Sequence, residues 1–361
     1  MELKSLKKDS TLKTLVIVAC LFIIVGGMKI AANILNPFFL AIFISIVASQ
    51  PVNWLINKGV RKSISIVIVM LLIITFGILV GGLIGGSIAQ FTQNLPKLDK
   101  NFTDAFKNLI LQLNDIGINV SDEKILKAID PGKIMGFTAS TINGMGNILG
   151  QTMIITFIVL FILFELESFP TKYKIITVYE KSPHVYNFEM IIHNVRSYLG
   201  IKTLTSLATG IIIAFSLKLI GIQYAFFWGL IAFLMNYIPN IGSLLAAIPA
   251  LLFAIIENGL GDTLWTAGVY VAVNTIIGSI LEPKIMGDGL GLSTLVVLLS
   301  LLFWGWVFGP IGMFLSVPFT MSLKIILETS DSSKWLSVIL DSEDNTKKQW
   351  RDMIEERDKD D

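Results

Sequence analysis

The stretch "NYIPNIGSLLAAIP", residues 236–249, gathers hydrogen-bonding side chains inside an otherwise apolar run. Asn236 and Asn240 are four residues apart, on one helical face if the helix persists, and Tyr237 lies three residues before Asn240. Two amides and a phenol donate and accept hydrogen bonds without net charge. This chemistry suits a neutral polyol or a sugar-like solute better than an ion.

Two further polar residues, Asn274 and Glu282, lie within or at the end of an apolar run. Asn274 is in the middle of 263–281, where it offers either a polar group along a solute path or an interhelical hydrogen bond. An ionisable residue at membrane depth is a functional hypothesis by default. Glu282, directly before Pro283, is therefore either a gate or proton-coupling group, or it forms a salt bridge to Lys284 or a helix cap.

The composition indicates what must hold these residues in place. Of 361 residues, 53% are hydrophobic and only 15% are charged, with a mean hydropathy of +0.73. A soluble domain carries about 25% charged residues. Several uncharged runs are longer than the roughly 20 residues that a helix needs to cross a bilayer, and none shows the alternation of a membrane β-strand. The sequence predicts an all-α integral membrane protein that crosses or enters the bilayer about eight times.

Other classes of function lack support in the sequence. A net charge of +1 implies no nucleic-acid partner. There is no P-loop pattern, so the chain encodes no such ATPase, and His184 and His193 have no neighbouring cysteine with which to bind a metal. Cys20 is the single cysteine, so no disulfide forms within the chain. We therefore expect no enzyme activity, no cofactor and no metal site.

The order of apolar and polar stretches predicts four regions. They are three N-terminal membrane helices in 1–93, a small helical cap in 94–145, a membrane transport region in 146–330 and a polar, solvated tail in 331–361. Basic residues collect before the first helix and in 58–62 and 170–197. Because short cytoplasmic loops are rich in Lys and Arg, both termini are expected in the cytoplasm and the cap outside.

Two uncharged blocks in the transport region, 219–256 and 289–323, are too long for one upright crossing. The first would extend about 57 Å as a straight helix, against a hydrocarbon core of about 30 Å. Both contain residues expected to break the backbone: Pro239, Gly242 and Pro249 in the first, and Gly309, Pro310, Gly312 and Pro318 in the second. Each block is either a re-entrant hairpin or a long, broken crossing. The charges of the linkers favour hairpins that enter from opposite faces.

Two other membrane helices carry features that bear on packing. The helix expected over 63–93 has glycines at four-residue spacing, which is typical of a close helix-packing face; these are Gly77, Gly81, Gly82, Gly85 and Gly86. A helix expected over about 198–220 places Lys202 and Lys218 near its ends, where long side chains reach toward water.

The two broken blocks also carry a resemblance to a known family. The segments "FFWGLIAFLMNYIPNIGSLLAAIP" and "ILEPKIMGDGLGLSTLVVLLSLLFWGWVFGPIGMFLSVPF" resemble the signature segments of the autoinducer-2 exporter family. The resemblance implies an inner-membrane protein that exports autoinducer-2, a small sugar-like quorum-sensing signal, and that self-associates into a homo-oligomer. Some relatives resemble cation/proton antiporters, for which Glu282 and Glu165 would be the ion-handling candidates. A membrane scaffold without transport activity is the third alternative.

Overall fold

The computed structural model describes most of the chain outside one long insertion. The described residues are 2–83, 85–86, 151–165, 172, 175, 184–239, 241–286, 291–328, 333–343, 345–347, 350–351 and 354. The expected cap, 94–145, and Asn240 lie outside these residues.

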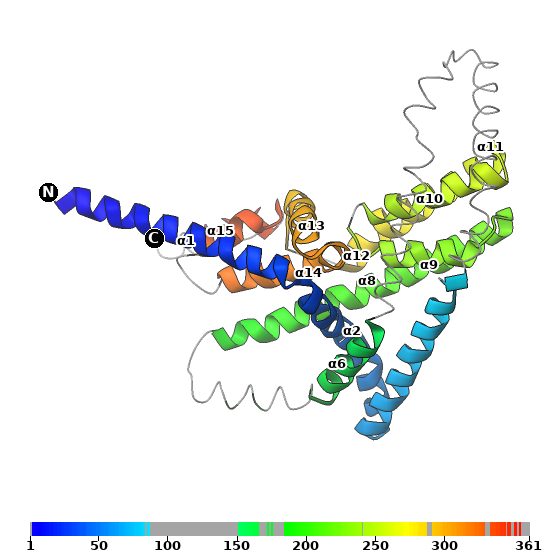
Figure 1. The fold of residues 1–361 in the computed structure, drawn as a ribbon, viewed down its shortest axis with the longest axis horizontal. Helices are drawn as coiled ribbons and strands as arrows, with labels where there is room; N and C mark the ends of the chain where they lie inside the picture. Colours follow the sequence, from blue (N-terminus) through cyan, green and yellow to red (C-terminus); the bar gives the residue numbers. More distant parts are fainter. Residues whose placement is uncertain are drawn as a thin grey trace, which may run out of the picture.

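Every element that the structure assigns in the described residues is a helix (Figure 1). The helices are α1 Glu2–Ile30, α2 Ala32–Asn57, Lys62–Leu83, α6 Thr152–Glu165, α8 His184–Ile220, α9 Ala225–Met235, α10 Gly242–Glu257, α11 Leu260–Val273, η1 Asn274–Leu281, α12 Glu282–Met286, α13 Thr294–Phe308, α14 Pro310–Glu328 and α15 Lys334–Leu340. Among them, five stretches are long and apolar enough to cross a membrane: 32–57, 62–83, 190–220, 260–286 and 310–328. The fold is that of a polytopic helical membrane protein.

The central element is α8, which runs through the molecule beside α9 (Figure 1). It begins at His184, so the prediction of a helix starting near 198 is wrong. The polar side chains in 184–197 misled that prediction, because a helix that continues beyond the apolar core does not show an apolar run. The consequence is that Lys202 lies well inside α8 and not at its end.

Small residues let α8 and α9 approach closely. A Cβ at Gly210 would lie 2.8 Å from the carbonyl oxygen of Gly229, and a Cβ at Gly229 would lie 2.6 Å from the carbonyl oxygen of Gly210. Glycine removes the side chains that would separate the backbones, as is common between membrane helices. The sequence analysis predicted close packing at the glycines of 77–86 and did not identify this glycine pair.

The block 219–256 folds back on itself as a helical hairpin. α9 ends at Met235 and α10 begins at Gly242, and the rings of Trp228 and Phe253 approach to 5.6 Å between centroids. About 37 Å would separate these residues along a straight helix. The reversal requires glycine at 242, because a Cβ there would overlap the carbonyl oxygen of Met235.

The block 289–323 forms a second hairpin from α13 and α14. The indole Nε1 of Trp304 donates a hydrogen bond to Thr320 Oγ1 at 3.1 Å, although about 24 Å would separate the two residues along a straight helix. Gly309 turns the chain with φ +66°, a conformation that glycine adopts without strain. Pro310 then opens α14, where its missing N–H is not needed.

Three of the residues expected to break the backbone lie inside helices. Pro249 is inside α10, and Gly312 and Pro318 are inside α14, so the prediction that they interrupt the backbone is wrong. Membrane helices tolerate proline where surrounding groups satisfy the freed carbonyl. The reversals occur instead at residues 236–241, which include Pro239, and at Gly309.

Three apolar clusters hold the helices together. The first joins α8, α9, α10 and α11; the second joins α2, α8, the α9–α10 reversal, α13 and α14; the third joins α2, the helix 62–83 and α6. α8 contributes to the first two clusters, and α2 contributes to the last two. Polar side chains of α8 that face the α9–α10 reversal are therefore held between both hairpins.

The start of the tail does not match the expectation of a solvated segment. Ser337 and Asp341 are buried against the rest of the chain. They lie on α15 and directly after it, and Asp341 pairs with Lys324 of α14. A tail carboxylate can be buried here because a lysine compensates its charge, which the sequence of the tail alone does not reveal.

Candidate functional site

A row of polar side chains on α8 marks the candidate site. Lys202, Thr203, Thr205 and Ser206 follow one another within about one turn of an otherwise apolar helix. Lys202, Thr205 and Ser206 are buried, and Thr203 is partly buried. Buried polar groups require hydrogen-bond partners, and those of α8 find them on two other elements.

The first partner is the reversal between α9 and α10. Asn236, buried to 6% exposure, donates from Nδ2 to Ser206 Oγ at 3.0 Å. Tyr237 donates from its hydroxyl to Thr203 Oγ1 at 2.9 Å, and Thr203 donates in turn to the carbonyl oxygen of Leu199 at 2.6 Å. These bonds fix the orientation of an amide and a phenol, both uncharged, where the helix is interrupted.

The second partner is Glu282, at the junction of η1 and α12. Its Oε1 lies 2.6 Å from Lys202 Nζ, and its Oε2 accepts a hydrogen bond from Thr205 Oγ1 at 3.3 Å. The side chains of Lys202 and Glu282 are only 6% and 14% exposed. The two charges cancel within the protein, which is the condition under which charged groups persist at membrane depth.

The helix that presents Glu282 has an unusual form. Residues 274–281 form η1, a π-helix of eight residues between α11 and α12. π-Helical segments are rare, mostly single turns and frequent at functional sites. A π-helical turn carries more residues than an α-helical one, so η1 changes the direction in which the next side chain, Glu282, leaves the helix. The meeting of Glu282 with Lys202 therefore depends on this segment.

Tyr237 also links the site to the second hairpin. Its ring stacks on Phe314 of α14 at 4.4 Å between centroids, and Phe43 of α2 contacts it edge-on at 5.6 Å. Phe314 lies in the second turn of α14, soon after the reversal at Gly309. The reversals of both hairpins thus lie close to Tyr237.

Within the described residues 291–328, the reversal of the second hairpin is packed mainly by aromatic side chains. Trp304, Phe308 and Phe319 pack together, with the Trp304 and Phe319 rings 4.9 Å apart. One amide reaches this reversal: Asn36 of α2 donates from Nδ2 to the carbonyl oxygen of Phe308 at 3.1 Å. This region is an aromatic brace that is joined across its arms by the Trp304–Thr320 hydrogen bond and to α2 by Asn36.

The structure brings together three of the five residues that the sequence nominated for a solute path. Asn236, Tyr237 and Glu282 lie around α8, whereas Asn274 is exposed at the start of η1 and does not join them. Asn240 lies outside the described residues. Of the interpretations left open for Glu282, a salt bridge is present, but its partner is Lys202 and not Lys284.

Lys202 is the residue that sequence reasoning missed. It was expected at a helix end with its side chain reaching toward water, and the structure shows it buried and paired. The signal that points to it is the run "KTLTS", residues 202–206, which places one charge and three hydroxyls in succession inside an apolar stretch.

Several other predictions fall outside this site. The glycine stripe at 77–86 has open space at the Cβ positions of Gly77, Gly82, Gly85 and Gly86, so its role in packing stays a prediction. Glu165, the second ion-handling candidate, is exposed and pairs with Lys172. It does not approach the cluster on α8.

The arrangement favours binding over catalysis. Amide, phenol and hydroxyl groups surround one compensated charge pair, and these groups hydrogen-bond a polyhydroxylated solute without demanding net charge from it. Apolar and aromatic walls with a few placed polar groups are typical of small-molecule sites.

Comparison with known proteins agrees with this description. Residues 15–331 match the family model "AI-2E family transporter". The chain is 37% identical over 340 residues to a "Putative transport protein" of Haemophilus influenzae, covering 92% of this chain and 97% of the relative. It is 36% identical over 329 residues to "AI-2 transport protein TqsA" of Escherichia coli, covering 91% and 95%. It is 35% identical over 322 residues to "Putative transport protein YhhT" of the same species, covering 89% and 92%.

These matches extend over nearly the whole chain and include both hairpins and α8. The relatives are transporters and not enzymes, and the described helices have the length and composition of membrane spans. The chain belongs to the AI-2E family of membrane transporters.

Proposed function

We propose that this protein exports autoinducer-2, or a sugar-like solute of similar size and polarity, from the cytoplasm across the bacterial inner membrane. The name of the TqsA relative supports the substrate. The observation that carries the proposal is the set of buried, uncharged hydrogen-bonding groups at the α9–α10 reversal, Asn236 and Tyr237, facing the hydroxyls of α8.

The proposed membrane placement makes both hairpins re-entrant. α9 has 11 residues and α13 has 15, which correspond to about 16 Å and 22 Å of helix, short of the ~30 Å core. Hairpins that enter from opposite faces would meet inside the bilayer, in keeping with the contact of Tyr237 with Phe314. Both termini then lie in the cytoplasm and the insertion 94–145 lies outside.

A cysteine at 258 tests this placement. Asn258 is exposed between α10 and α11, and replacing the single native cysteine, Cys20, provides a clean background. We expect Asn258→Cys to react with a membrane-impermeant thiol reagent added to intact cells. Reaction only after permeabilisation would place this turn in the cytoplasm and exclude the re-entrant arrangement.

The site also explains why solute movement would need a conformational change. A buried charge pair is stable only while both partners remain compensated. In the proposed cycle Lys202 and Glu282 hold α8 against η1 while the site is closed, and they part as the solute's hydroxyls take over their hydrogen bonds. No nucleotide chemistry enters this cycle.

Cation/proton antiport is the second candidate, and the buried carboxylate of Glu282 specifically favours it. Protonation of Glu282 would remove its charge and release Lys202, so an ion gradient has a group on which to act. This candidate predicts that Glu282→Gln abolishes activity, whereas substitution of the neutral groups, including Asn240→Ala, does not.

Reconstitution into liposomes separates the candidates. Purified protein is supplied with labelled autoinducer-2 and, in parallel, with sodium or potassium gradients and an entrapped pH-sensitive dye. The proposed function predicts signal movement that falls in Asn236→Ala and Tyr237→Phe. Cation-driven pH change without signal movement would replace it with antiport. Movement of neither would reject both and leave a scaffold role.

A further inference from the structure

The short helix α15 buries its serine and the aspartate that follows it, and it exposes its large apolar residues. Ser337 is 3% exposed, and Asp341, which follows the helix, is 6% exposed, whereas Trp335 and Ile339 are 60% and 62% exposed. A helix on the surface of a soluble domain shows the opposite arrangement, with its apolar stripe toward the core. Water is therefore an unfavourable environment for the outer face of α15.

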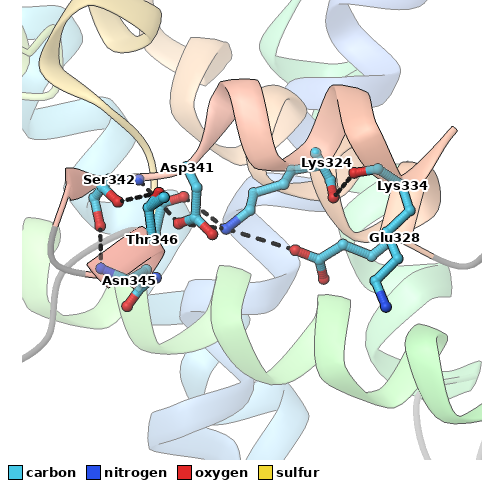
Figure 2. Close-up of polar contacts among 9 residues, drawn as sticks. Lys324, Glu328, Lys334, Asp341, Ser342, Asn345 and Thr346 are labelled. Atoms are coloured by element: carbon cyan, nitrogen blue, oxygen red, sulfur yellow. Dashed lines mark hydrogen bonds and ion pairs between the residues drawn. The ribbon is translucent and has the colours of Figure 1, made fainter. Parts of the chain in front are cut away.

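The inward polar face is held by a buried lysine of α14 (Figure 2). Lys324 Nζ lies 3.1 Å from Asp341 Oδ1 and 3.6 Å from a carboxylate oxygen of Glu328. It also donates to the carbonyl oxygen of Gly291 at 2.7 Å, and the backbone N–H of Ser342 donates to Asp341 Oδ1 at 2.9 Å. Asp341 is thus compensated and hydrogen-bonded, which fixes the side of α15 that faces the protein.

The same contacts tie α15 to the base of the second hairpin. The backbone N–H of Ser293, the N-cap of α13, donates to the carbonyl oxygen of Leu340 at 3.1 Å. Gly291 has φ +59°, and a Cβ there would lie 3.0 Å from Lys324 Nζ. α15, the end of α14 and the start of α13 therefore form one packed unit, and the apolar outer face of α15 is fixed relative to the membrane helices.

We propose that α15 lies in the plane of the membrane surface, with Trp335 and Ile339 inserted between the lipid headgroups and the upper acyl chains. α14 is a candidate membrane span, and its Leu323 and Ile326 are also exposed near its end. Only four residues lie between Glu328 and Ser333, so α15 stays close to the level at which α14 leaves the bilayer. Tryptophan is enriched at this level.

Charge complementarity identifies lipid as the occupant. Exposed basic residues lie on and just beyond α15, namely Lys334, Arg351 and Lys347, the last of which is paired with Glu343. Basic residues beside an apolar helix face are the signature of an interfacial helix on anionic lipid. In this position α15 anchors the base of the α13/α14 hairpin at a constant depth while the other hairpin moves.

Spin labels measure the depth of the helix directly. In full-length protein with Cys20→Ser, Ile339→Cys and Glu343→Cys are labelled with a nitroxide in liposomes of phosphatidylethanolamine and phosphatidylglycerol. Both native side chains are exposed, so both variants are expected to fold. We expect the label at 339 to collide more with dissolved oxygen than with a water-soluble nickel chelate, and the label at 343 to show the reverse.

Two results would overturn the proposal. Preferential collision with nickel at 339 would mean that the outer face is solvated. Dipolar broadening between labels at 339, removed by dilution with unlabelled protein, would mean that a second copy covers it. Neither measurement uses transport, so the proposal is decided separately from the function proposed above.

A second experiment removes the contact between Lys324 and Asp341. Asp341→Ala should raise the mobility of a label at 339 and lower its oxygen preference, because α15 loses its inward attachment. Glu343→Ala is the matched control, since the carboxylate it removes is exposed and pairs with the exposed Lys347. An equal response to both changes would contradict the role assigned to the Lys324–Asp341 contact. Asp341→Asn, which keeps hydrogen bonding, serves if Asp341→Ala does not fold.

Discussion

The two hairpins follow the same plan and differ in what their reversals hold. In α9/α10 the reversal carries Asn236 and Tyr237, which bond to hydroxyls of α8. In α13/α14 the reversal is packed by Trp304, Phe308 and Phe319 and tied to α2 by Asn36. Polar groups that hydrogen-bond are exchangeable for a solute, whereas a packed aromatic cluster is not. The same chain reversal thus carries the proposed binding site in one hairpin and an aromatic brace in the other.

The arrangement of charge supports this division. The pair Lys202–Glu282 lies beside the first hairpin within membrane segments, and the pair Lys324–Asp341 lies at the base of the second, where α14 ends. In the proposed cycle the first pair responds to a solute at the reversal. The second holds the hairpin's base to α15 (Figure 2).

The largest expected effect comes from breaking the buried pair of the first hairpin. Lys202→Met leaves Glu282 uncompensated and should lower the free energy of unfolding by about 3–5 kcal/mol, measured by denaturant titration in mixed micelles. Lys202→Met combined with Glu282→Leu should recover most of the stability but not transport. Recovery of both would show that the pair is only structural, and the contrast with the second hairpin would fail.

Replacing a glycine near either reversal should destabilise the two hairpins to a similar extent, and this is the next largest effect. Gly242→Ala and Gly312→Ala each place a Cβ against a carbonyl oxygen, that of Met235 or of Trp304. Each should destabilise by about 1–3 kcal/mol or more through overpacking, measured in the same titration. Gly85→Ala is the matched control, because open space surrounds its Cβ position. A neutral result at Gly242 alone would mean that the first reversal is looser than described.

A smaller effect should separate binding from bracing. Tyr237→Phe and Trp304→Phe each remove one hydrogen bond and should destabilise by about 1 kcal/mol; Trp304→Phe also loses ring area. Only Tyr237→Phe should raise the KM of solute transport in liposomes, because its hydroxyl belongs to the proposed site. A rise in KM for Trp304→Phe of the same size would make both hairpins part of the binding site.

The smallest effect is expected at the polar tie of the second hairpin. Asn36→Ala removes the bond to Phe308 but also removes a buried amide oxygen, Oδ1, that has no hydrogen-bond partner in the described structure. These contributions oppose each other, so the loss in unfolding free energy should stay below about 1 kcal/mol, with KM unchanged. A loss of transport would assign this amide a role in the path.

The fold class and the interrupted blocks could be predicted from the sequence, whereas the partners of the site residues could not. The amide and phenol at 236 and 237 stand out because polar groups are rare in an apolar run. Lys202 did not stand out as a site residue, because its helix was predicted to begin near residue 198. The observed helix begins at His184, 14 residues earlier, so Lys202 lies inside it. Pro249 and Pro318 were predicted to interrupt the backbone, but both lie inside continuous helices. Proline weakens a helix locally, and surrounding packing can keep the helix continuous.

Composition and run length by themselves determined that this chain is a helical membrane protein, and the glycines and prolines determined roughly where two of its blocks reverse. These properties are local, because hydropathy and backbone freedom belong to a residue and its near neighbours. Only the tertiary structure decided that Glu282 meets Lys202, 80 residues away, and that Asp341 is buried on Lys324. The physical reason is that a charge pair forms only when two helices bring its members within reach. The direction in which each side chain leaves its helix follows from helix packing and, for Glu282, from the π-helical turn of η1. The local sequence pattern does not encode either.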